Sequence, residues 1–306
     1  MSTAEETKEM VRRQYAEIAL QDKATNTSSC CGAGGCSTEV YNIMSEDYSS
    51  LEGYTANADL GLGCGLPTEF ADIKPGDTVL DLGSGAGNDC FVARAIAGED
   101  GRVIGVDFTP EMIAKAKANA AQLGFQNVEF RQGDIEALPL TSNIVDVVVS
   151  NCVLNLVPNK RQAMSEVLRV LKPGGHFSIS DVVLNGELPE NIKNAAALYA
   201  GCVSGALQES EYLGIIHDLG FEQVTVQKRK PIIVPDDILS NYLSAEEIAA
   251  FKASGTGIFS ITVAATKSET QCCAPTAEST AKIKLTTVEG ATLPTEGMCG
   301  PGSTCC

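Results

Sequence analysis

Apolar runs alternate with segments of helical periodicity through the middle of the chain. TVLDL, RVIGVD and IVDVVVSN are short and rich in β-branched residues, which is typical of strands that are covered on both faces. PEMIAKAKANAAQLG has helical spacing, with proline in its first turn and glycine after its end. The pattern predicts strands over 78–82, 102–107, 127–131, 145–150 and 176–182, and helices near 89–98, 110–123 and 158–171.

This alternation predicts an α/β fold with a doubly wound, mostly parallel sheet whose strands end at one edge, where ligands bind. Upstream of the first strand, residues 1–25 predict an amphipathic helix that acts as a lid or cap. The segment 26–37, NTSSCCGAGGCS, predicts a mobile loop, and 38–70 predicts short helices and turns.

Downstream of the fifth strand the pattern is looser. NIKNAAALYAGCVSGAL predicts a helix of small residues, and YLGIIHDLGFEQVTVQKRK predicts a helix, a stop at Gly220 and a strand. GIFSITVAATK predicts a last, antiparallel strand, and a short helical insertion is expected over 231–255. From residue 267 onward the chain is rich in Thr, Ser, Glu, Gly and Pro, which predicts a disordered tail.

The first strand runs directly into a glycine-rich turn. TVLDLGSGAGNDC carries Gly83, Gly85 and Gly87, and the helical segment FVARAIA follows at once. Glycine allows the backbone to turn sharply and lets a ligand approach without interference from Cβ atoms. The free N–H groups of the following helix then face that ligand.

The residues around this turn favour S-adenosylmethionine over a dinucleotide. The dinucleotide motif would need glycine at position 88, where the chain has Asn88. Asp81 would repel a pyrophosphate but can meet a sulfonium or amino group. Asp107 ends the second strand, where it can accept from ribose hydroxyls. Asp134 and Ile135 follow the third, where they suit the edge and face of an adenine. An α/β domain with acidic loops and no such ligand is the simpler alternative.

The complete set of cofactor-binding candidates comes from these strand ends and from the turns and helix starts that follow them. It comprises Asp81, Gly83, Ser84, Gly85, Gly87, Asn88, Asp107, Phe108, Met112, Gly133, Asp134, Ile135 and Asn151.

Charge and hydropathy exclude some partners. The 306 residues carry a formal charge of −17 with only 22 Lys and Arg, which argues against nucleic acid and anionic membranes as partners. No apolar run is long enough to span a bilayer, and the N-terminus lacks an apolar secretory core. We therefore expect a cytoplasmic protein with reduced thiols.

The cysteine content is unusual for such a protein. Twelve cysteines are present, six of them in the adjacent pairs 30–31, 272–273 and 305–306. The chain has only two histidines and no zinc-type spacing, so a softer, more thiophilic element than zinc is the better hypothesis.

Three isolated cysteines occupy positions that the predicted fold would bring together. Cys64 precedes the core in a GCG loop, Cys152 follows the fourth strand, and Cys202 lies in the helix after the fifth. The fourth strand borders the point where ligands meet in such sheets. A free cysteine is also often a small buried apolar residue, and we interpret Cys90, on the first helix of the core, in that way.

The order D-x-G-x-G-x-G, acidic strand end and G-D-I resembles the class I methyltransferases, which have a Rossmann-like sheet and use S-adenosylmethionine. GLGCGLP, SNCVLNLVP, KRQAMSEVLRVLKPGGHFSISD and LYAGCVSGAL further resemble the arsenite methyltransferases, over about residues 41–267. The resemblance implies that Cys64, Cys152 and Cys202 ligate As(III). It also implies an N-terminal redox cysteine that cycles with the GCG-loop cysteine, a role open to Cys30, Cys31 or Cys36.

This resemblance agrees with simple chemistry. As(III) prefers thiolate to oxygen ligands, and three thiolates leave its lone pair free as a nucleophile that needs no general base. Methylation raises arsenic to the pentavalent state, so a thiol reductant such as glutathione or thioredoxin is implied. The expected substrates are arsenite and methylated arsenicals.

Two other functions are compatible with parts of the chain. One is a small-molecule C- or O-methyltransferase of the quinone-biosynthesis kind, and the other is a thiol-rich metalloid-binding protein without turnover. In the preferred interpretation, residues 1–69 form a cap with cysteine loops and 70–183 the S-adenosylmethionine-binding core. Residues 184–266 supply the arsenic-site helix, the insertion and the remaining strands, and 267–306 form the cysteine-containing tail.

Overall fold

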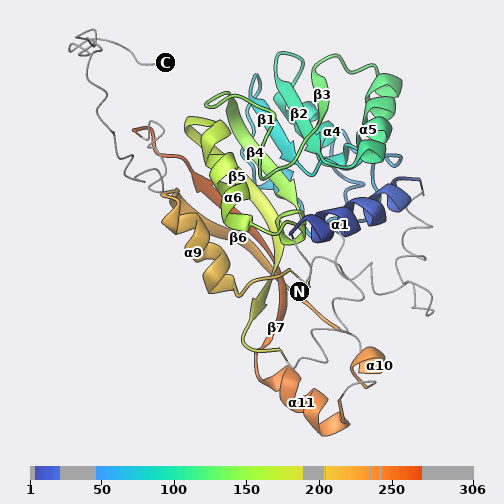
Figure 1. The fold of residues 1–306 in the computed structure, drawn as a ribbon, viewed down its shortest axis with the longest axis vertical. Helices are drawn as coiled ribbons and strands as arrows, with labels where there is room; N and C mark the ends of the chain where they lie inside the picture. Colours follow the sequence, from blue (N-terminus) through green and yellow to red (C-terminus); the bar gives the residue numbers. More distant parts are fainter. Residues whose placement is uncertain are drawn as a thin grey trace, which may run out of the picture. The chain divides into compact units, whose positions relative to one another are not determined.

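A seven-stranded sheet forms the centre of the protein (Figure 1). The computed structural model describes residues 4–20, 46–188, 203, 205–234, 236–240 and 243–270. The strand order is β3-β2-β1-β4-β5-β7-β6, with β7 antiparallel to both of its neighbours. The strands are β1 (Thr78–Leu82), β2 (Arg102–Asp107), β3 (Val128–Gln132), β4 (Val145–Asn151), β5 (Leu171–Asn185), β6 (Glu222–Ile232) and β7 (Gly257–Thr266).

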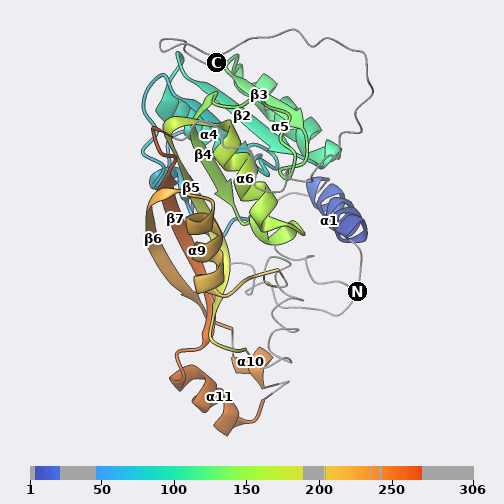
Figure 2. The same ribbon diagram turned by 60° about the vertical axis from the view of Figure 1, so that its left-hand side comes forward.

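Helices cover both faces of this sheet (Figures 1 and 2). One face packs on α6 and α9, and the other packs on α4 and α5, with α1 next to α5. The described helices are α1 (Ala4–Ala19), η1 (Pro67–Glu69), α4 (Asn88–Ala97), α5 (Pro110–Leu123), η2 (Leu154–Leu156), α6 (Lys160–Val170), α9 (Glu209–Asp218), α10 (Asp236–Leu239) and α11 (Ala245–Ala253).

The central strands explain this three-layer arrangement. In β4, Val148 packs into the core cluster under α6 and α9, while Val147 and Val149 pack into the cluster under α4 and α5. A strand with valine on both faces must be covered on both faces, because either face left in water would expose apolar surface. The unbroken β-branched run of the sequence therefore determines the central position of β4.

The α/β class, the mostly parallel sheet and the antiparallel last strand are confirmed. The main difference lies in β5, which begins before the expected residue 176. Its pairing with β4 shifts register between Leu171 and His176, across the Pro173–Gly175 segment that lies between the expected helix and the expected strand. The expected loop 26–37, most of the Cys202 helix and the tail from 271 onward lie outside the described residues.

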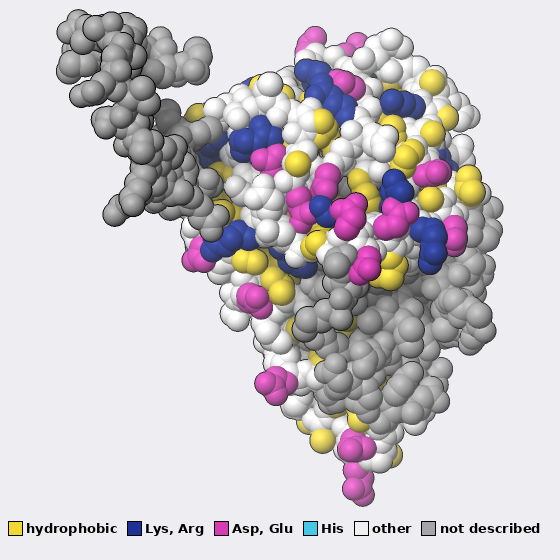
Figure 3. Space-filling model, in the orientation of Figure 1, with side chains coloured by type: hydrophobic (Ala, Val, Ile, Leu, Met, Phe, Trp, Pro, Cys, Tyr) yellow, Lys and Arg dark blue, Asp and Glu magenta, His cyan; other side chains and the backbone are white. Residues whose placement is uncertain are grey.

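Charged side chains of both signs lie on the surface. Figure 3 shows acidic and basic side chains interspersed over one face of the molecule, rather than a basic patch on that face. In the described part of the chain, no helix has both the length and the apolar character needed to cross a lipid bilayer.

Lys267 joins the end of β7 to the region where α6 passes into β5. Its side chain is 2% exposed, and its ammonium donates to Asn143 Oδ1 (2.7 Å), Leu168 O (2.8 Å) and Leu171 O (2.7 Å). The Leu168 and Leu171 carbonyls belong to or follow the last turn of α6, where a helix has no internal donors left. A buried ammonium with three acceptors therefore closes the C-terminal end of α6.

We predict that Lys267→Met lowers the free energy of unfolding by about 1–3 kcal/mol, because buried acceptors would lose their donor. Urea denaturation followed by circular dichroism measures this change. The matched control is Lys252→Met, because Lys252 pairs with Asp236 at 2.5 Å on the surface. That variant should lose no more than about 1 kcal/mol. Equal losses in both variants would contradict the assigned role of Lys267.

Candidate functional site

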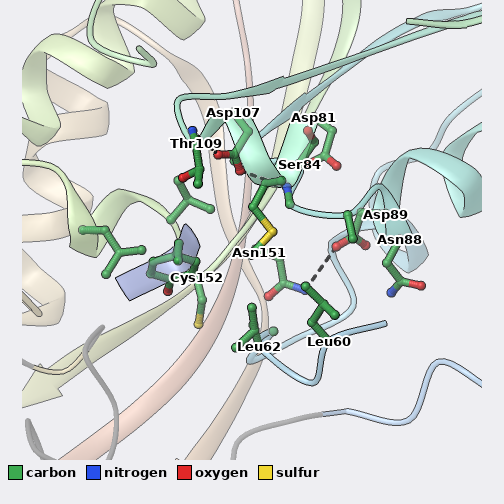
Figure 4. A pocket seen from close by; sticks show the side chains of 18 of the residues that line it. Leu60, Leu62, Asp81, Ser84, Asn88, Asp89, Asp107, Thr109, Asn151 and Cys152 are labelled. Atoms are coloured by element: carbon green, nitrogen blue, oxygen red, sulfur yellow. Dashed lines mark hydrogen bonds between the residues drawn. The ribbon is translucent and has the colours of Figure 1, made fainter. Parts of the chain in front are cut away.

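A pocket opens at the carboxyl ends of β1, β2 and β4, and the empty space within it and at its open mouth is about 1090 Å³. Carboxylates lie along its upper side in Figure 4, and Leu60 and Leu62 lie below them. Its walls are formed by Lys8, Tyr15, Tyr48, Ala58, Asp59, Leu60, Gly61, Leu62, Gly63, Asp81, Gly83, Ser84, Gly85, Ala86, Asn88, Asp89, Asp107, Phe108, Thr109, Met112, Asp134, Ile135, Asn151, Cys152, Val153, Leu156 and Val157.

The glycine-rich turn between β1 and α4 forms one wall of the pocket, and its three glycines have positive φ angles. A Cβ at Gly85 would meet nothing within 4 Å, so the backbone faces open space there. A Cβ at Gly83 would lie 2.4 Å from Val153, and one at Gly87 would lie 2.9 Å from the rings of Phe91 and Phe130. Gly85 therefore provides the open approach, while the other two glycines permit close packing.

Three buried carboxylates lie along this wall. Burial raises the pKa of Asp81 well above its usual value, and the neighbouring Asp89 and Asp107 raise it further. The Cys90 thiol donates to Asp81 Oδ2 at 3.2 Å. Burial also raises the pKa of Asp89 to about 6, although hydrogen bonds from Tyr48 and Asn151 oppose the shift. The wall is therefore poorly compensated in its ionised form and suited to a cationic group.

Asp107 ends β2 and is held by the backbone on both oxygens. Gly85 N–H donates to Oδ2 at 3.0 Å and Thr109 N–H donates to Oδ1 at 2.8 Å. Its pKa is nevertheless raised, because the cost of burial exceeds the stabilisation from these donors. A carboxylate fixed in this way presents its remaining lone pairs in constant directions.

Helix α1 reaches this pocket through Lys8. Lys8 Nζ forms ion pairs with Asp134, at 2.6 Å, and with Glu136. Both carboxylates follow β3, and Asp134 Oδ1 also accepts from Glu136 N–H at 2.9 Å. At its other end, α1 is held by Lys115 Nζ, which donates to Ala19 O at 2.9 Å. The N-terminal helix therefore lines one side of the pocket.

Cys64 and Cys152 lie side by side, although 88 residues separate them in the sequence. Their sulfur atoms are joined in a disulfide, and their Cα atoms are 5.9 Å apart. Cys64 is 1% exposed and Cys152 is 4% exposed, and both pack among Val182, Leu184 and Ile258. Cys152 also lines the pocket, so the sulfur pair borders it.

Most of the predicted site residues come together. All of the cofactor-binding candidates line the pocket except Gly87 and Gly133, and a Cβ at Gly133 would lie 2.7 Å from Pro139. Cys90 is fully buried beside Asp81. Cys202, Cys30, Cys31 and Cys36 lie outside the described residues. Within the described part of the chain, no group of three or more His, Cys, Asp or Glu is arranged to hold a metal ion.

Several wall residues were not among the sequence candidates, and four of them form ion pairs or side-chain hydrogen bonds at the pocket. Asp89 stands directly beside Asn88, so its place at the start of α4 was the available signal. Asp59 and Tyr48 come from a segment of turns without periodicity, and no pattern marked them. Lys8 is on the helix expected as a cap, but its partner after β3 could not be read from spacing.

Comparisons with known proteins agree with this geometry. A family model described as a methyltransferase domain matches residues 73–220. An arsenite methyltransferase of Halobacterium salinarum is 46% identical over 235 residues, covering 72% of this chain and 59% of that protein. An arsenite methyltransferase of Aquipseudomonas alcaligenes is 34% identical over 242 residues, covering 77% of this chain and 68% of that protein. The match thus spans about three fifths to two thirds of these relatives.

A solved structure is also similar. The crystal structure of an arsenic(III) S-adenosylmethionine methyltransferase from Chlamydomonas reinhardtii has a TM-score of 0.57 and 34% sequence identity, covering 69% of each chain. Fold and sequence therefore point to the same family.

We predict that Lys8→Gln loosens α1, because Asp134 and Glu136 lose their shared cation. At about 1 kcal/mol for a partly exposed ion pair, amide hydrogen exchange across α1 should become about fivefold faster. Exchange in α4 should not change, and hydrogen-exchange mass spectrometry measures both helices at once.

The matched control is Arg12→Gln. Arg12 forms an ion pair with Glu9 of the same helix at 2.6 Å, and both side chains are exposed. That variant should leave exchange across α1 within about twofold of the wild type, because an exposed ion pair within one helix stabilises it by only about 0.3–0.5 kcal/mol. If Lys8→Gln exchanged no faster than Arg12→Gln, Lys8 would not be the anchor of α1.

Proposed function

This chain belongs to the arsenite methyltransferase family, and from that premise we propose that it transfers a methyl group from S-adenosylmethionine to thiolate-bound As(III), giving methylated arsenicals. The observation that carries the proposal is the sulfur pair of Cys64 and Cys152 at the border of the acidic pocket. A methyltransferase acting on carbon or oxygen has no need for two converging sulfur atoms there. A soft element that prefers thiolate ligands does.

Cys202 is proposed as the third ligand. Its own position lies outside the described residues, but Val203, the next residue, is buried in the apolar cluster that contains Cys64 and Cys152. Ala206 belongs to the same cluster, and Leu207 O accepts from Leu184 N–H of β5 at 2.9 Å. The chain just after Cys202 is thus held beside the sulfur pair, which supports a three-thiolate site.

The pocket fits the proposed cofactor. S-adenosylmethionine supplies an electrophilic methyl group on a sulfonium cation when it is bound. Asp81 and Asp89 would face its cationic groups and Asp107 its ribose hydroxyls, while Asp134 and Ile135 would receive the adenine. Ser84 Oγ and Asn88 Oδ1 are buried and have no hydrogen-bond partner among the described residues. Buried polar atoms of this kind are normally paired, so the pair suits a polar ligand.

The chain's own contribution is mainly positioning. The two sulfur atoms are already held together, and binding of As(OH)₃ by three thiols would release three water molecules. The arsenic lone pair is the nucleophile, so the site needs no general base. Leu60, Leu62 and Val153 supply apolar wall that excludes water from the reacting centre. Orientation of this kind is worth up to about 7–11 kcal/mol in well-aligned cases.

A thiol reductant is required by electron balance. The Cys64–Cys152 disulfide must accept two electrons before its sulfur atoms can act as thiolate ligands, and arsenic must be reduced again after each methylation. We propose glutathione or thioredoxin as the source, with Cys30, Cys31 or Cys36 as the relay. In the same proposal, residues 1–69 act as the cap, 70–183 as the cofactor core, 184–266 as the arsenic-site region and 267–306 as an accessory tail.

The experiment that tests this function combines the protein with arsenite, S-adenosylmethionine and glutathione and follows arsenic species over time by chromatography with mass detection. We predict that Cys64→Ser, Cys152→Ser and Cys202→Ser each lower the rate at least about 100-fold. Loss of an outer partner of a metal ligand already costs about 10–100-fold, and loss of a ligand should cost more.

The control is the double change Cys272→Ser with Cys273→Ser, measured at saturating arsenite, which should retain the wild-type rate. Survival of methylation of a small organic acceptor in all three serine variants would favour the quinone-type methyltransferase. Tight arsenite binding without consumption of S-adenosylmethionine would favour a binding protein without turnover.

The raised pKa of Asp89 gives a pH prediction. Below about pH 6 this carboxyl is protonated in the folded protein and cannot stabilise a cation. The affinity for S-adenosylmethionine should therefore fall about fourfold between pH 7.5 and 5.5, the value for one linked proton with a pKa near 6. Calorimetry at the two pH values measures it.

S-adenosylhomocysteine, which lacks the sulfonium charge, is the internal control for this measurement. Its affinity should fall less than that of S-adenosylmethionine over the same interval. An equal or larger fall for S-adenosylhomocysteine would separate Asp89 from recognition of the sulfonium.

A further inference from the structure

The GCG loop has no regular secondary structure, yet Cys64 N–H, Cys64 O and Gly65 O are all held by side chains from other segments. Cys64 N–H donates to Asn151 Oδ1 at 3.0 Å, and Gly65 O accepts from Asn151 Nδ2 at 2.8 Å. On the other side, Cys64 O accepts from Ser260 Oγ of β7 at 2.6 Å. One side-chain amide thus binds two consecutive residues of the loop.

Asn151 is the residue directly before Cys152. Its main chain ends β4 and leads into one cysteine, while its side chain holds the backbone of the other. The orientation of the amide is determined by its partners, because an N–H can meet only Oδ1 and a carbonyl can meet only Nδ2. Asn151 therefore connects the two cysteines without involving sulfur: a peptide bond joins it to Cys152, and two hydrogen bonds join its side chain to the backbone of Cys64 and Gly65.

The close approach of the loop to β4 and β5 explains the two glycines that flank Cys64. A Cβ at Gly63 would lie 2.6 Å from Asn151 Nδ2, and a Cβ at Gly65 would lie 2.4 Å from Ser180 Oγ. Any side chain at either position would push the loop away from the sheet. The GCG motif is thus the form of loop that allows Asn151 to reach the backbone at hydrogen-bond distance.

Tyr48 and Asp89 hold the amide of Asn151 in place. Asn151 Nδ2 donates to the Tyr48 hydroxyl at 2.6 Å, and that hydroxyl donates to Asp89 Oδ1 at 2.9 Å. Tyr48 is 4% exposed, and burial together with Asp89 raises the pKa of its phenol well above the usual value. The hydroxyl therefore keeps its proton and remains a donor to Asp89 throughout the neutral range. The acidic pocket and the GCG loop share one chain of hydrogen bonds.

We propose that Asn151 is the positioning residue that sets Cys64 against Cys152, and that Tyr48, anchored on Asp89, fixes the amide orientation this requires. The significance for arsenic rests on the proposed function, but the positioning itself does not. Two thiols that are held close form a disulfide more readily than two that are free to separate, because less chain entropy is lost. The disulfide equilibrium of the pair therefore measures positioning directly.

The test equilibrates the full-length protein with glutathione redox buffers, in which the dithiol and one glutathione disulfide give the protein disulfide and two glutathiones. Peptide mapping by mass spectrometry after acid quenching quantifies the Cys64–Cys152 disulfide alone. Asn151→Ala should lower its equilibrium constant about tenfold, since the two hydrogen bonds from this side chain to the loop, of about 0.5–1.5 kcal/mol each, are lost. An equilibrium constant within twofold of the wild type would overturn the proposal.

Tyr48→Phe keeps the ring and removes only the hydroxyl. It therefore tests the hydrogen-bonded chain from Asp89 through Tyr48 to Asn151 without creating a cavity. It should lower the constant about threefold, for the loss of one supporting hydrogen bond. The double variant should be no worse than Asn151→Ala alone, because Tyr48 acts through Asn151. Full additivity of the two changes would overturn the role assigned to Tyr48.

The matched control is Tyr54→Phe. Tyr54 lies in the same segment of turns and donates to another pocket carboxylate, Asp59 Oδ2, at 3.2 Å. This variant should leave the equilibrium constant within twofold of the wild type. A fall equal to that of Tyr48→Phe would overturn the role assigned to the Tyr48 hydroxyl. Absence of arsenite methylation in the wild type would refute the proposed function and would leave the redox result a valid test of positioning.

Discussion

Buried negative charge is the constraint on which the site depends. Asp81, Asp89 and Asp107 lie within one wall, and a carboxylate taken out of water is costly unless donors or cations compensate it. The wall supplies only partial compensation: backbone N–H groups for Asp107, a hydroxyl for Asp89 and a weak thiol donor for Asp81. The pKa of each carboxyl remains raised. A cationic ligand that enters this pocket would therefore supply the stabilisation that the protein does not give these carboxylates.

The sheet determines where that charge meets sulfur. Asp81 on β1 is paired with Val149 on β4, and Leu82 with Ser150, so the two strands end together. One residue beyond the last pair, β1 enters the glycine turn at Gly83 and β4 reaches Asn151, which Cys152 follows. β2 lies on the other side of β1, so the crossovers leave β1 and β4 in opposite directions and open a crevice between them. A single register therefore sets the distance from carboxylate to cysteine.

The strands, the strand-end carboxylates and the cap helix were predictable, because periodicity and topology act on short stretches of sequence. Asp107 and Asp134 were found because parallel strands end at a common edge. The reasons for individual glycines were not predictable. A side chain at Gly83 would collide with Val153 and one at Gly87 with phenylalanine rings, so these two glycines are required by packing rather than by a ligand.

Contacts between distant segments could not be predicted from the hydrophobic pattern either. Tyr48 lies in a region of turns, and nothing in its neighbourhood marks a partner 103 residues away. The approach of Cys64 to Cys152 was suggested by their places relative to the predicted strands and by a family resemblance, and not by their spacing. Side-chain pairs of this kind depend on how loops cross the sheet, and a single sequence carries that information only weakly.

The surroundings of the sulfur pair favour particular chemical states. Val182, Leu184 and Ile258 pack around Cys64 and Cys152, and an apolar environment penalises a free thiolate. A disulfide carries no charge, and neither does As(III) bound by three thiolates, so both states are compatible with the apolar cluster, whereas two free thiolates beside buried carboxylates are not. Under the proposed function, the same packing that makes the reduced and deprotonated pair costly increases the gain when arsenic binds it. Both sides of the site then favour a bound ligand. The acidic side leaves negative charge that a cationic ligand neutralises, and the apolar side leaves thiols whose charge is removed when they bind arsenic.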